Sequence, residues 1–188
     1  MVADALGQQS LMAVARLESG SPPDSPPAVC PCVCVGYIVR HQALSQGRCN
    51  LLLQGITRAR IVRECEAATG YRQAILEPIE KKGASQEDEL ASIRGRLEIL
   101  LGGPLLRQLP ALGAIHDWLA DELPTAALVD LLALACCDNE ADRYRILSDA
   151  DPAARALWME NHLQSLVRTL RAARHLGPTQ SEDGLNLN

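Results

Sequence analysis

The sequence predicts an α+β protein in which the strands come first and the helices follow. Across residues 29–61, apolar residues either run continuously or alternate with polar ones, which is typical of buried and half-buried strands. Beyond residue 83, apolar residues recur every three or four positions, which indicates helices. Because strands grouped before helices favour an α+β fold or two subdomains, we expect a β-rich subdomain at residues 1–82, a helical subdomain at 83–177 and a disordered tail at 178–188.

The β-rich part contains two segments with a strong strand pattern. Residues 29–41 predict one long strand, with Pro31 at an edge or bulge because proline cannot donate to the ladder. Residues 47–61, GRCNLLLQGITRARI, predict two strands joined through Gly55, the first continuously apolar and the second alternating. The other expected elements are the end of a helix at 1–6, strands at 10–17 and 71–80, and a Pro/Ser-rich loop at 20–27.

The helical part carries clear start and stop signals. Ser85 is the expected cap of a helix that ends at residues 102–104, Gly-Gly-Pro. Asp151 followed by Pro152 predicts the start of the longest helix, since Asp caps helices and proline suits the first helical position. Gly177 ends this helix. Between these two, we expect helices at 115–123, 126–136 and 139–147.

Composition argues against several classes of function. A net charge of −5 argues against nucleic-acid binding driven by phosphate neutralisation. No apolar run reaches the roughly 20 residues that span a bilayer, and the first residues lack a signal-peptide pattern. We therefore expect a cytoplasmic protein that does not enter membranes and whose seven cysteines are reduced thiols.

The cysteine spacing favours structural roles over metal binding. Cys30, Cys32 and Cys34 alternate along one predicted strand and would face the same side, as three small hydrophobic residues. Zinc sites usually pair cysteines two to four residues apart across a turn. Cys136 and Cys137 are adjacent in a helical pattern, so their thiols would not share one face. We expect no metal site and no cofactor.

The stretch at residues 47–61 also resembles a known family. A turn glycine at Gly47, an apolar run, Gln-Gly at Gly55, and then Arg58, Arg60 and Ile61 in the sequence R-A-R-I resemble the LON domain. This is the amino-terminal substrate-binding domain of ATP-dependent Lon proteases, which also occurs in stand-alone bacterial proteins. The stretches LPTAALVDLLALAC and YRILSDADPAARALWMENHL are similar to two helices of the family, with Arg155 at the usual arginine position.

The resemblance implies a PUA-like β pseudobarrel followed by a helical bundle. The sequence departs from the family pattern in two places. Arg143-Tyr144-Arg145 stands where the family has Lys-Gln. Family members also open with two strands and a helix whose ending is similar to MVADAL, the first residues of this chain. We therefore expect the pseudobarrel to be incomplete at the amino terminus, through a misassigned start or a lost segment.

The motifs of full-length Lon enzymes are missing from this sequence. Lys81 and Lys82 are its two lysines and precede Gly83-Ala84, so no glycine-rich loop ends in the Lys-Ser/Thr that holds phosphates. No segment resembles the Ser-Lys protease site, and no G-x-S-x-G motif supports a serine triad. We expect a non-catalytic protein, with no catalytic residues to nominate.

Four arginines suggest an alternative function. Arg58, Arg60, Arg63 and Arg72 would form a strip on the sheet, and PUA-like folds often bind RNA. RNA-binding modules usually add stacking aromatic residues, whereas only Tyr71 lies near this strip. We favour a structural role for the arginines and keep an RNA-binding module as the alternative.

The resemblance implies that the chain binds proteins. The expected partners are unfolded clients, and a protease or chaperone for which the chain would act as an adaptor. Such binding needs exposed apolar surface. For the leucines named below, we favour packing between subdomains over a role in binding. The candidate surface residues are Cys32, Val33, Cys34 and Val35 on the cysteine-rich strand, and Leu105, Leu106 and Leu109 in a Pro/Gly-interrupted loop.

Overall fold

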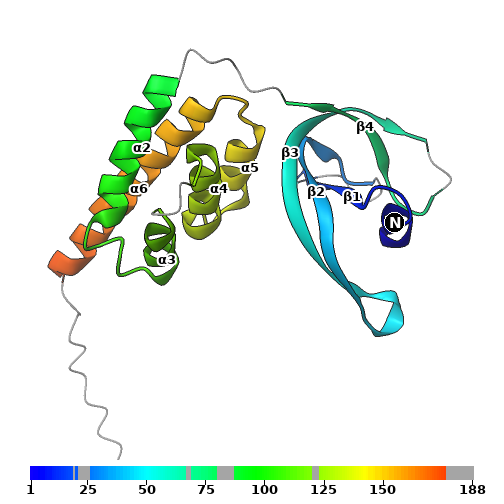
Figure 1. Cartoon of the computed structure of the whole chain (residues 1–188), viewed down its shortest axis with the longest axis horizontal. Helices are drawn as coiled ribbons and strands as arrows, with labels where there is room; N and C mark the ends of the chain where they lie inside the picture. The colour runs from blue at the N-terminus through cyan, green and yellow to red at the C-terminus, as the bar shows by residue number, and fades with distance from the viewer. Residues whose placement is uncertain (19, 21–25, 67–68, 80–86, 120–122, 177–188) are drawn as a thin grey trace, which may run out of the picture. The chain divides into compact units, whose positions relative to one another are not determined.

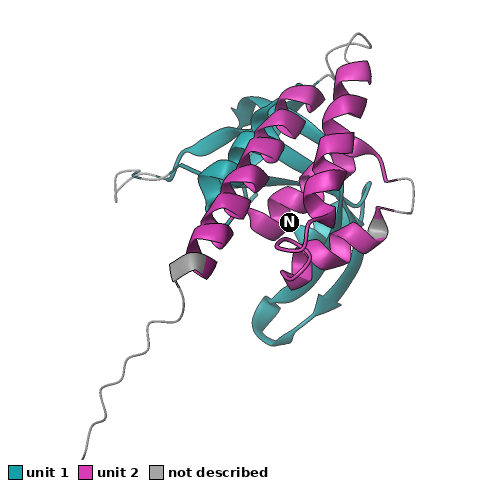
Figure 2. Cartoon of the chain, turned by 90° about the vertical axis from the view of Figure 1, so that its left-hand side faces the viewer, with its two compact units in different colours: residues 1–82, 138–151 teal, residues 83–137, 152–188 magenta. Residues whose placement is uncertain are grey.

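The computed structural model describes residues 1–18, 20, 26–66, 69–79, 87–119 and 123–176. The chain divides into two compact units (Figures 1 and 2). Unit 1 comprises Met1–Lys82 and Asp138–Asp151, and unit 2 comprises Gly83–Cys137 and Pro152–Asn188. The expected tail at 178–188 lies outside the described residues.

Unit 1 is built on one antiparallel sheet of four strands in the order β1-β2-β3-β4 (Figure 1). The short helix α1 leads into it, and the expected α+β class, with strands before helices, is confirmed. The elements are α1 (Val2–Leu6), β1 (Leu11–Leu17), β2 (Val29–Ala43), the 3₁₀ turn η1 (Ser45–Gly47), β3 (Cys49–Cys65) and β4 (Gln73–Pro78).

The expected division of the 47–61 segment at Gly55 is wrong. Residues Cys49–Cys65 form a single strand, and Gly55 lies inside it opposite Gly36 of β2. A β-carbon at Gly55 would lie 3.3 Å from the Cys34 sulfur, so the glycine marks a close approach between neighbouring strands. The chain reverses instead at η1, where Gln46 and Gly47 adopt positive φ angles of 62° and 71°.

The β2–β3 and β3–β4 pairings of the described sheet contain three β-bulges, each of which inserts a β-branched residue, and the β1–β2 pairing has a further irregularity between Ala15 and Leu17. Val39 is the extra residue on β2, and Ile56 and Val62 are the extra residues on β3. Their exposed fractions are 52%, 58% and 57%. Because a bulge bends its strand and increases the local twist, these insertions curve the long β2–β3 pair.

Helix α5 (Glu140–Ser148) belongs to unit 1, whereas the expected helical subdomain at 83–177 grouped it with the other helices. It begins after Asn139, whose side chain accepts a hydrogen bond from the backbone N–H of Asp142 at 2.8 Å. The Tyr144 hydroxyl accepts a hydrogen bond from the N–H of Cys32 at 2.9 Å. This bond anchors α5 to β2.

Unit 2 is helical and contains α2 (Glu87–Gly102), α3 (Pro110–Trp118), α4 (Thr125–Cys136) and α6 (Pro152–Leu176). The predicted start of the longest helix at Pro152 is confirmed. Helix α3 begins at Pro110, earlier than expected, because proline suits the first turn. No described helix is long and apolar enough to cross a membrane. The largest fully buried side chains of this unit include Ile93, Leu97, Leu101, Leu106, Leu112, Leu128, Leu132, Met159 and Leu163.

Candidate functional site

Unit 1 contains a cleft of about 510 Å³ bounded by α1, β1 and β4, which we call the unit 1 cleft. Ala13 of β1 lies directly opposite Val35 of β2, so both side chains point to the same face of the sheet and line the cleft. Leu11 and Leu76 add apolar surface from the two outer strands. The floor of the cleft is therefore mainly apolar.

The strands that border the cleft are the two edges of the described sheet. β1 pairs with β2, and β4 pairs with β3, at opposite ends of the strand order. An edge strand presents backbone N–H and C=O groups that the sheet itself does not pair. The cleft thus combines an apolar floor with backbone groups able to pair with another extended chain.

A hydrogen bond between Asp4 and Tyr71 links α1 to the segment before β4. The Tyr71 hydroxyl donates to Oδ2 of Asp4 at 2.9 Å, and the amino terminus lies 3.3 Å from the same oxygen. Donation from Tyr71, and then from the amino terminus, lowers the pKa of Asp4. The bond to Asp4 in turn raises the pKa of Tyr71. Both residues line the cleft, so this link holds α1 beside it.

The other charged group of the rim is already neutralised. Arg72 makes a bidentate ion pair with Glu64, with Nε 2.6 Å from Oε2, and also donates to the Pro27 carbonyl at 2.6 Å. The hydrogen bonds from Arg72 lower the pKa of Glu64. The rim therefore imposes little net charge on an entering chain.

Of the four arginines, Arg60 and Arg63 are exposed, whereas Arg58 and Arg72 are less available to an anion. Arg72 is paired with Glu64, Arg58 is half-buried, and Arg60 lies opposite Glu77 in the β3–β4 register. Tyr71, the nearby aromatic residue, is engaged with Asp4. This arrangement is consistent with arginine stems covering a sheet face.

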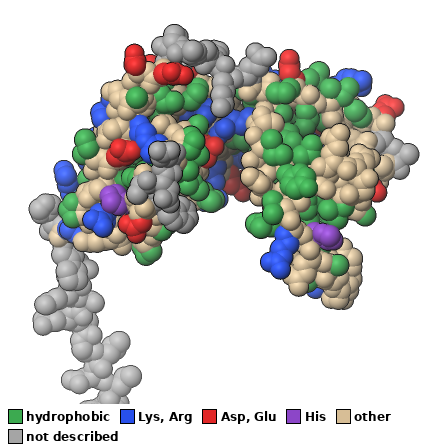
Figure 3. Space-filling view, viewed as in Figure 1, with side chains coloured by type: hydrophobic (Ala, Val, Ile, Leu, Met, Phe, Trp, Pro, Cys, Tyr) green, Lys and Arg blue, Asp and Glu red, His purple; other side chains and the backbone are tan. Residues whose placement is uncertain are grey.

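Exposed apolar side chains are frequent on the sheet of unit 1. Hydrophobic atoms gather over its strands in the space-filling view (Figure 3). Besides the three bulge residues, the large hydrophobic side chains exposed on the strands include Leu11, Val14, Leu17, Tyr37, Leu52 and Ile75. Contiguous apolar surface on a soluble domain is typical of an interaction site.

The structure corrects the candidate surface proposed for the cysteine-rich strand. Cys32 and Val33 are 5% and 1% exposed, because β2 is an inner strand covered on both faces. Cys34 and Val35 are half-buried, and Val35 lines the unit 1 cleft. Of the four residues, Val35 is the one that the structure brings to the cleft.

The three loop leucines lie in unit 2. Leu106 is buried, so it belongs to the helical core and not to a surface. Leu105 and Leu109 are half-buried. Leu105 lines a separate cavity of about 590 Å³ together with Ile99, Val167 and Arg171.

The cleft residues of α1, β1 and β4 were missed by the sequence reasoning. Ala13, Tyr71 and Leu76 are each unremarkable in the sequence, and only strand pairing brings them together. The expected strands at 10–17 and 71–80 placed these residues on strands but did not indicate which faces meet. The strand register, which no local pattern specifies, decides which faces meet.

The family-motif residues have structural positions. Gly47 has the positive φ of the β2–β3 turn, and Gly55 allows the close approach to Cys34. Ile61 pairs with Leu76. Arg155 is buried near the start of α6, with 4% exposed.

Comparison with known proteins identifies the family. The sequence matches the family described as the ATP-dependent protease La (LON) substrate-binding domain over residues 1–165. The N terminal domain of Mycobacterium avium complex Lon protease has a similar structure, with a TM-score of 0.67 and 16% identity, over 87% of this chain and 82% of that one. A Lon N-terminal domain protein from Xanthomonas campestris gives a TM-score of 0.50 and 17% identity, over 89% and 80% of the two chains.

A comparison with curated proteins finds no match. At these identities the structural likenesses show the shared fold, and the family match covers most of the chain. The expected resemblance is confirmed: the chain belongs to the family of ATP-dependent protease La (LON) substrate-binding domains, which are non-catalytic.

Proposed function

We propose that this chain binds extended, apolar segments of unfolded proteins in the unit 1 cleft, and that it acts as an adaptor presenting them to an ATP-dependent protease or chaperone. Family membership supports the coarser role of substrate binding. The observation that carries the finer proposal is the cleft itself, in which an apolar floor lies between the two edge strands of the sheet.

Strand addition is the binding mode that suits this geometry. An extended client segment pairs its backbone with the outward-facing groups of β1 or β4, and every second side chain then points into the cleft. Backbone pairing is independent of sequence, so it provides affinity for many clients. The apolar floor around Ala13, Val35 and Leu76 selects segments with apolar residues at alternate positions.

The size and charge of the cleft fit this kind of ligand. A volume of about 510 Å³ lies within the roughly 300–1,000 Å³ range of ligand pockets. Because Arg72 is paired with Glu64 and Asp4 with the amino terminus, the rim gives no strong preference for a charged client. Apolar segments of this type are buried in folded proteins and exposed in unfolded ones. The cleft therefore discriminates unfolded from native clients.

A matched pair of variants on β1 tests the proposal. Ala13 and Ala15 are both exposed and lie two residues apart on the same face, but only Ala13 lines the cleft. The assay measures fluorescence anisotropy of labelled lactalbumin that has been reduced and carboxymethylated, so that it stays unfolded. We expect Ala13→Asp to weaken binding about tenfold, because a carboxylate must be desolvated on the apolar floor.

Ala15→Asp is the control and should change binding less than about twofold, a difference below 0.5 kcal/mol. Native lactalbumin should not compete. Equal binding by both variants, or failure of the wild-type chain to bind the unfolded client, would contradict the cleft proposal. The adaptor role is tested separately, by the rate at which an ATP-dependent protease degrades the same client. Adding the wild-type chain should accelerate degradation, and adding Ala13→Asp should not.

A further inference from the structure

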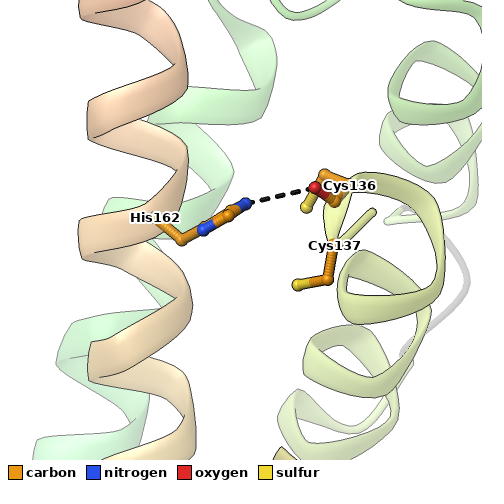
Figure 4. A group of neighbouring side chains, drawn as sticks. All are labelled: Cys136, Cys137 and His162. Carbon is orange, nitrogen blue, oxygen red and sulfur yellow. Dashed lines mark hydrogen bonds between the residues drawn. The ribbon is translucent and has the colours of Figure 1, made fainter. Parts of the chain in front are cut away.

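Unit 2 contains a cluster of metal-ligating side chains where α4 ends against α6. Cys136 is the last residue of α4, Cys137 follows it, and His162 projects from the middle of α6 (Figure 4). The two sulfur atoms and an imidazole nitrogen all lie within 4.8 Å of one another. Within the described ranges, this is the group of three histidine, cysteine or acidic side chains that meets the spacing of a metal site.

The cluster corrects the expectation that adjacent cysteines cannot share a site. In a continuous helix, neighbouring side chains point about 100° apart. Helix α4 stops at Cys136, and Cys137 adopts an extended backbone with φ −93° and ψ 103°. This change of backbone direction brings the second thiol to the same place as the first. The end of the helix therefore brings the two thiols together. The sequence pattern does not locate this end to a single residue.

The surroundings favour a soft metal ion. The Cys136 sulfur lies 3.8 Å from the Met159 thioether, so a third sulfur stands beside the three ligands. Cys137 and Met159 are buried, at 1% and 0% exposed. Thiolate, thioether and imidazole donors without a carboxylate select zinc or monovalent copper over the hard ions magnesium and calcium.

One hydrogen bond and one ring contact position His162 beside the two cysteines (Figure 4). Its Nε2 lies 3.1 Å from the Cys136 carbonyl. Because a carbonyl oxygen only accepts, Nε2 is the donor of this bond, and in the neutral ring Nδ1 is then the nitrogen that can bind a metal ion. The ring also stacks on Trp158, with centroids 5.1 Å apart and planes at 19°. A hydrogen bond from one ring N–H to a carbonyl is the common support of a ligating histidine.

We propose that Cys136, Cys137 and His162 bind a thiophilic d¹⁰ metal ion, Zn²⁺ or Cu⁺, through two thiolates and one imidazole nitrogen. Each thiol releases one proton on binding, and the step involves no oxidation or reduction. Zinc–sulfur bonds of about 2.3 Å in a tetrahedron place ligand sulfurs about 3.7 Å apart. The cluster, with distances up to 4.8 Å, therefore contracts by about 1 Å through side-chain rotation.

Metal titration of the full chain, prepared with reduced thiols, tests this proposal. Co²⁺ serves as a spectroscopic substitute for Zn²⁺, and a chromophoric chelator reports competition for Zn²⁺ in one arm and Cu⁺ in the other. We expect one ion per chain, a thiolate-to-cobalt absorption band, release of about two protons per ion, and a change in the fluorescence of Trp158, which stacks on His162. Tighter binding of Zn²⁺ or of Cu⁺ in this competition identifies which of the two ions the site prefers.

The variants locate the site. Cys136→Ala, Cys137→Ala and His162→Gln should each weaken metal binding at least about tenfold. Cys49→Ala, an exposed cysteine on β3, is the control and should bind as the wild-type chain does. Metal should also protect Cys136, which is half-buried, from alkylation in the wild-type chain, a readout that does not depend on the folding of any variant. Absence of binding in both arms, alkylation unchanged by metal, or binding unchanged in the three variants would each overturn the proposal.

Discussion

The Tyr144 hydroxyl accepts a hydrogen bond from the Cys32 backbone N–H at 2.9 Å, across 112 residues of sequence. The β1–β2 register is irregular at this point, because Ala15 pairs with Val33 and Leu17 pairs with Val29. Cys32 falls in the gap between these pairs in the described register, and the tyrosine hydroxyl supplies an acceptor for its N–H. The Arg16 guanidinium lies 5.8 Å from the centre of the Tyr144 ring. This contact makes the segment Asp138–Asp151 a structural part of the β unit.

Removal of the Tyr144 hydroxyl should destabilise unit 1. In Tyr144→Phe the Cys32 N–H loses its acceptor, and Cys32 is only 5% exposed. An unsatisfied buried donor costs about 1–3 kcal/mol of the free energy of unfolding. Urea unfolding measures the loss. Tyr37→Phe is the control, because Tyr37 is 45% exposed and its hydroxyl should matter little. A Tyr144→Phe chain as stable as the control would contradict the role of this bond.

Alkaline pH should remove part of the stability of the wild-type chain. Burial is the largest of the causes that raise the pKa of Tyr144 above its usual value of about 10. Above pH 10 the unfolded chain loses this proton while the folded chain retains it. The free energy of unfolding therefore falls as the pH rises from 10 towards the folded pKa. Tyr144→Phe lacks this group, so its stability should fall less over the same range. Parallel pH profiles for the two chains would count against the linkage.

Replacing one partner of the ion pair between α2 and α6 should destabilise the chain more than replacing both partners. Arg96 binds Glu160 through two bonds of 2.7 and 2.8 Å, and Glu160 is 5% exposed. In Arg96→Met the Glu160 carboxylate stays buried and keeps a hydrogen bond from the Gln164 amide, at 3.2 Å. We expect a lower urea midpoint for Arg96→Met and recovery of most of the loss in Arg96→Met/Glu160→Met, since an apolar pair avoids desolvating a charge.

The control for the ion pair is Arg168→Met, which replaces an exposed arginine on the same helix α6. Its urea midpoint should stay close to that of the wild-type chain. If the double variant were as unstable as Arg96→Met alone, the buried carboxylate would not be the cause of the loss.

The two glycines of the β2–β3 bulge should differ in their tolerance of a methyl group. A β-carbon at Gly36 would lie 3.3 Å from the Gln54 carbonyl oxygen, which belongs to the backbone and cannot move alone. A β-carbon at Gly55 would meet only the Cys34 sulfur, also at 3.3 Å, which can rotate. We expect Gly36→Ala to cost about 1–3 kcal/mol and Gly55→Ala clearly less in thermal or urea unfolding. The reverse order would contradict the bulge geometry.

The order of elements was predictable because local patterns encode it. Alternation identified the strands, and Asp151 with Pro152 fixed the start of α6. Gly55 was misread as a junction because its role depends on Gly36 and Cys34 of a different strand. The link between α5 and the sheet could not be predicted either, since a hydrogen bond between residues 112 apart leaves no periodic signal.

The candidate sites, too, depend on contacts between distant residues that local sequence patterns do not encode. The apolar character of Cys32 and Val33 was visible in the sequence, but their burial in an inner strand was not. Ala13 and Val35 become neighbours only through the β1–β2 register. The sulfur atoms of Cys136 and Cys137 lie close together because α4 ends between these residues, a boundary that sequence patterns locate only to within a few residues.

Amide hydrogen exchange with and without the unfolded client tests the central claim most directly. If an extended segment adds to an edge of the sheet in the unit 1 cleft, exchange should slow in β1 (Leu11–Leu17) or β4 (Gln73–Pro78) when carboxymethylated lactalbumin binds. The amides of α2 and α6 in unit 2 should be unchanged. Protection confined to unit 2, or binding that protects neither β1 nor β4, would contradict the account.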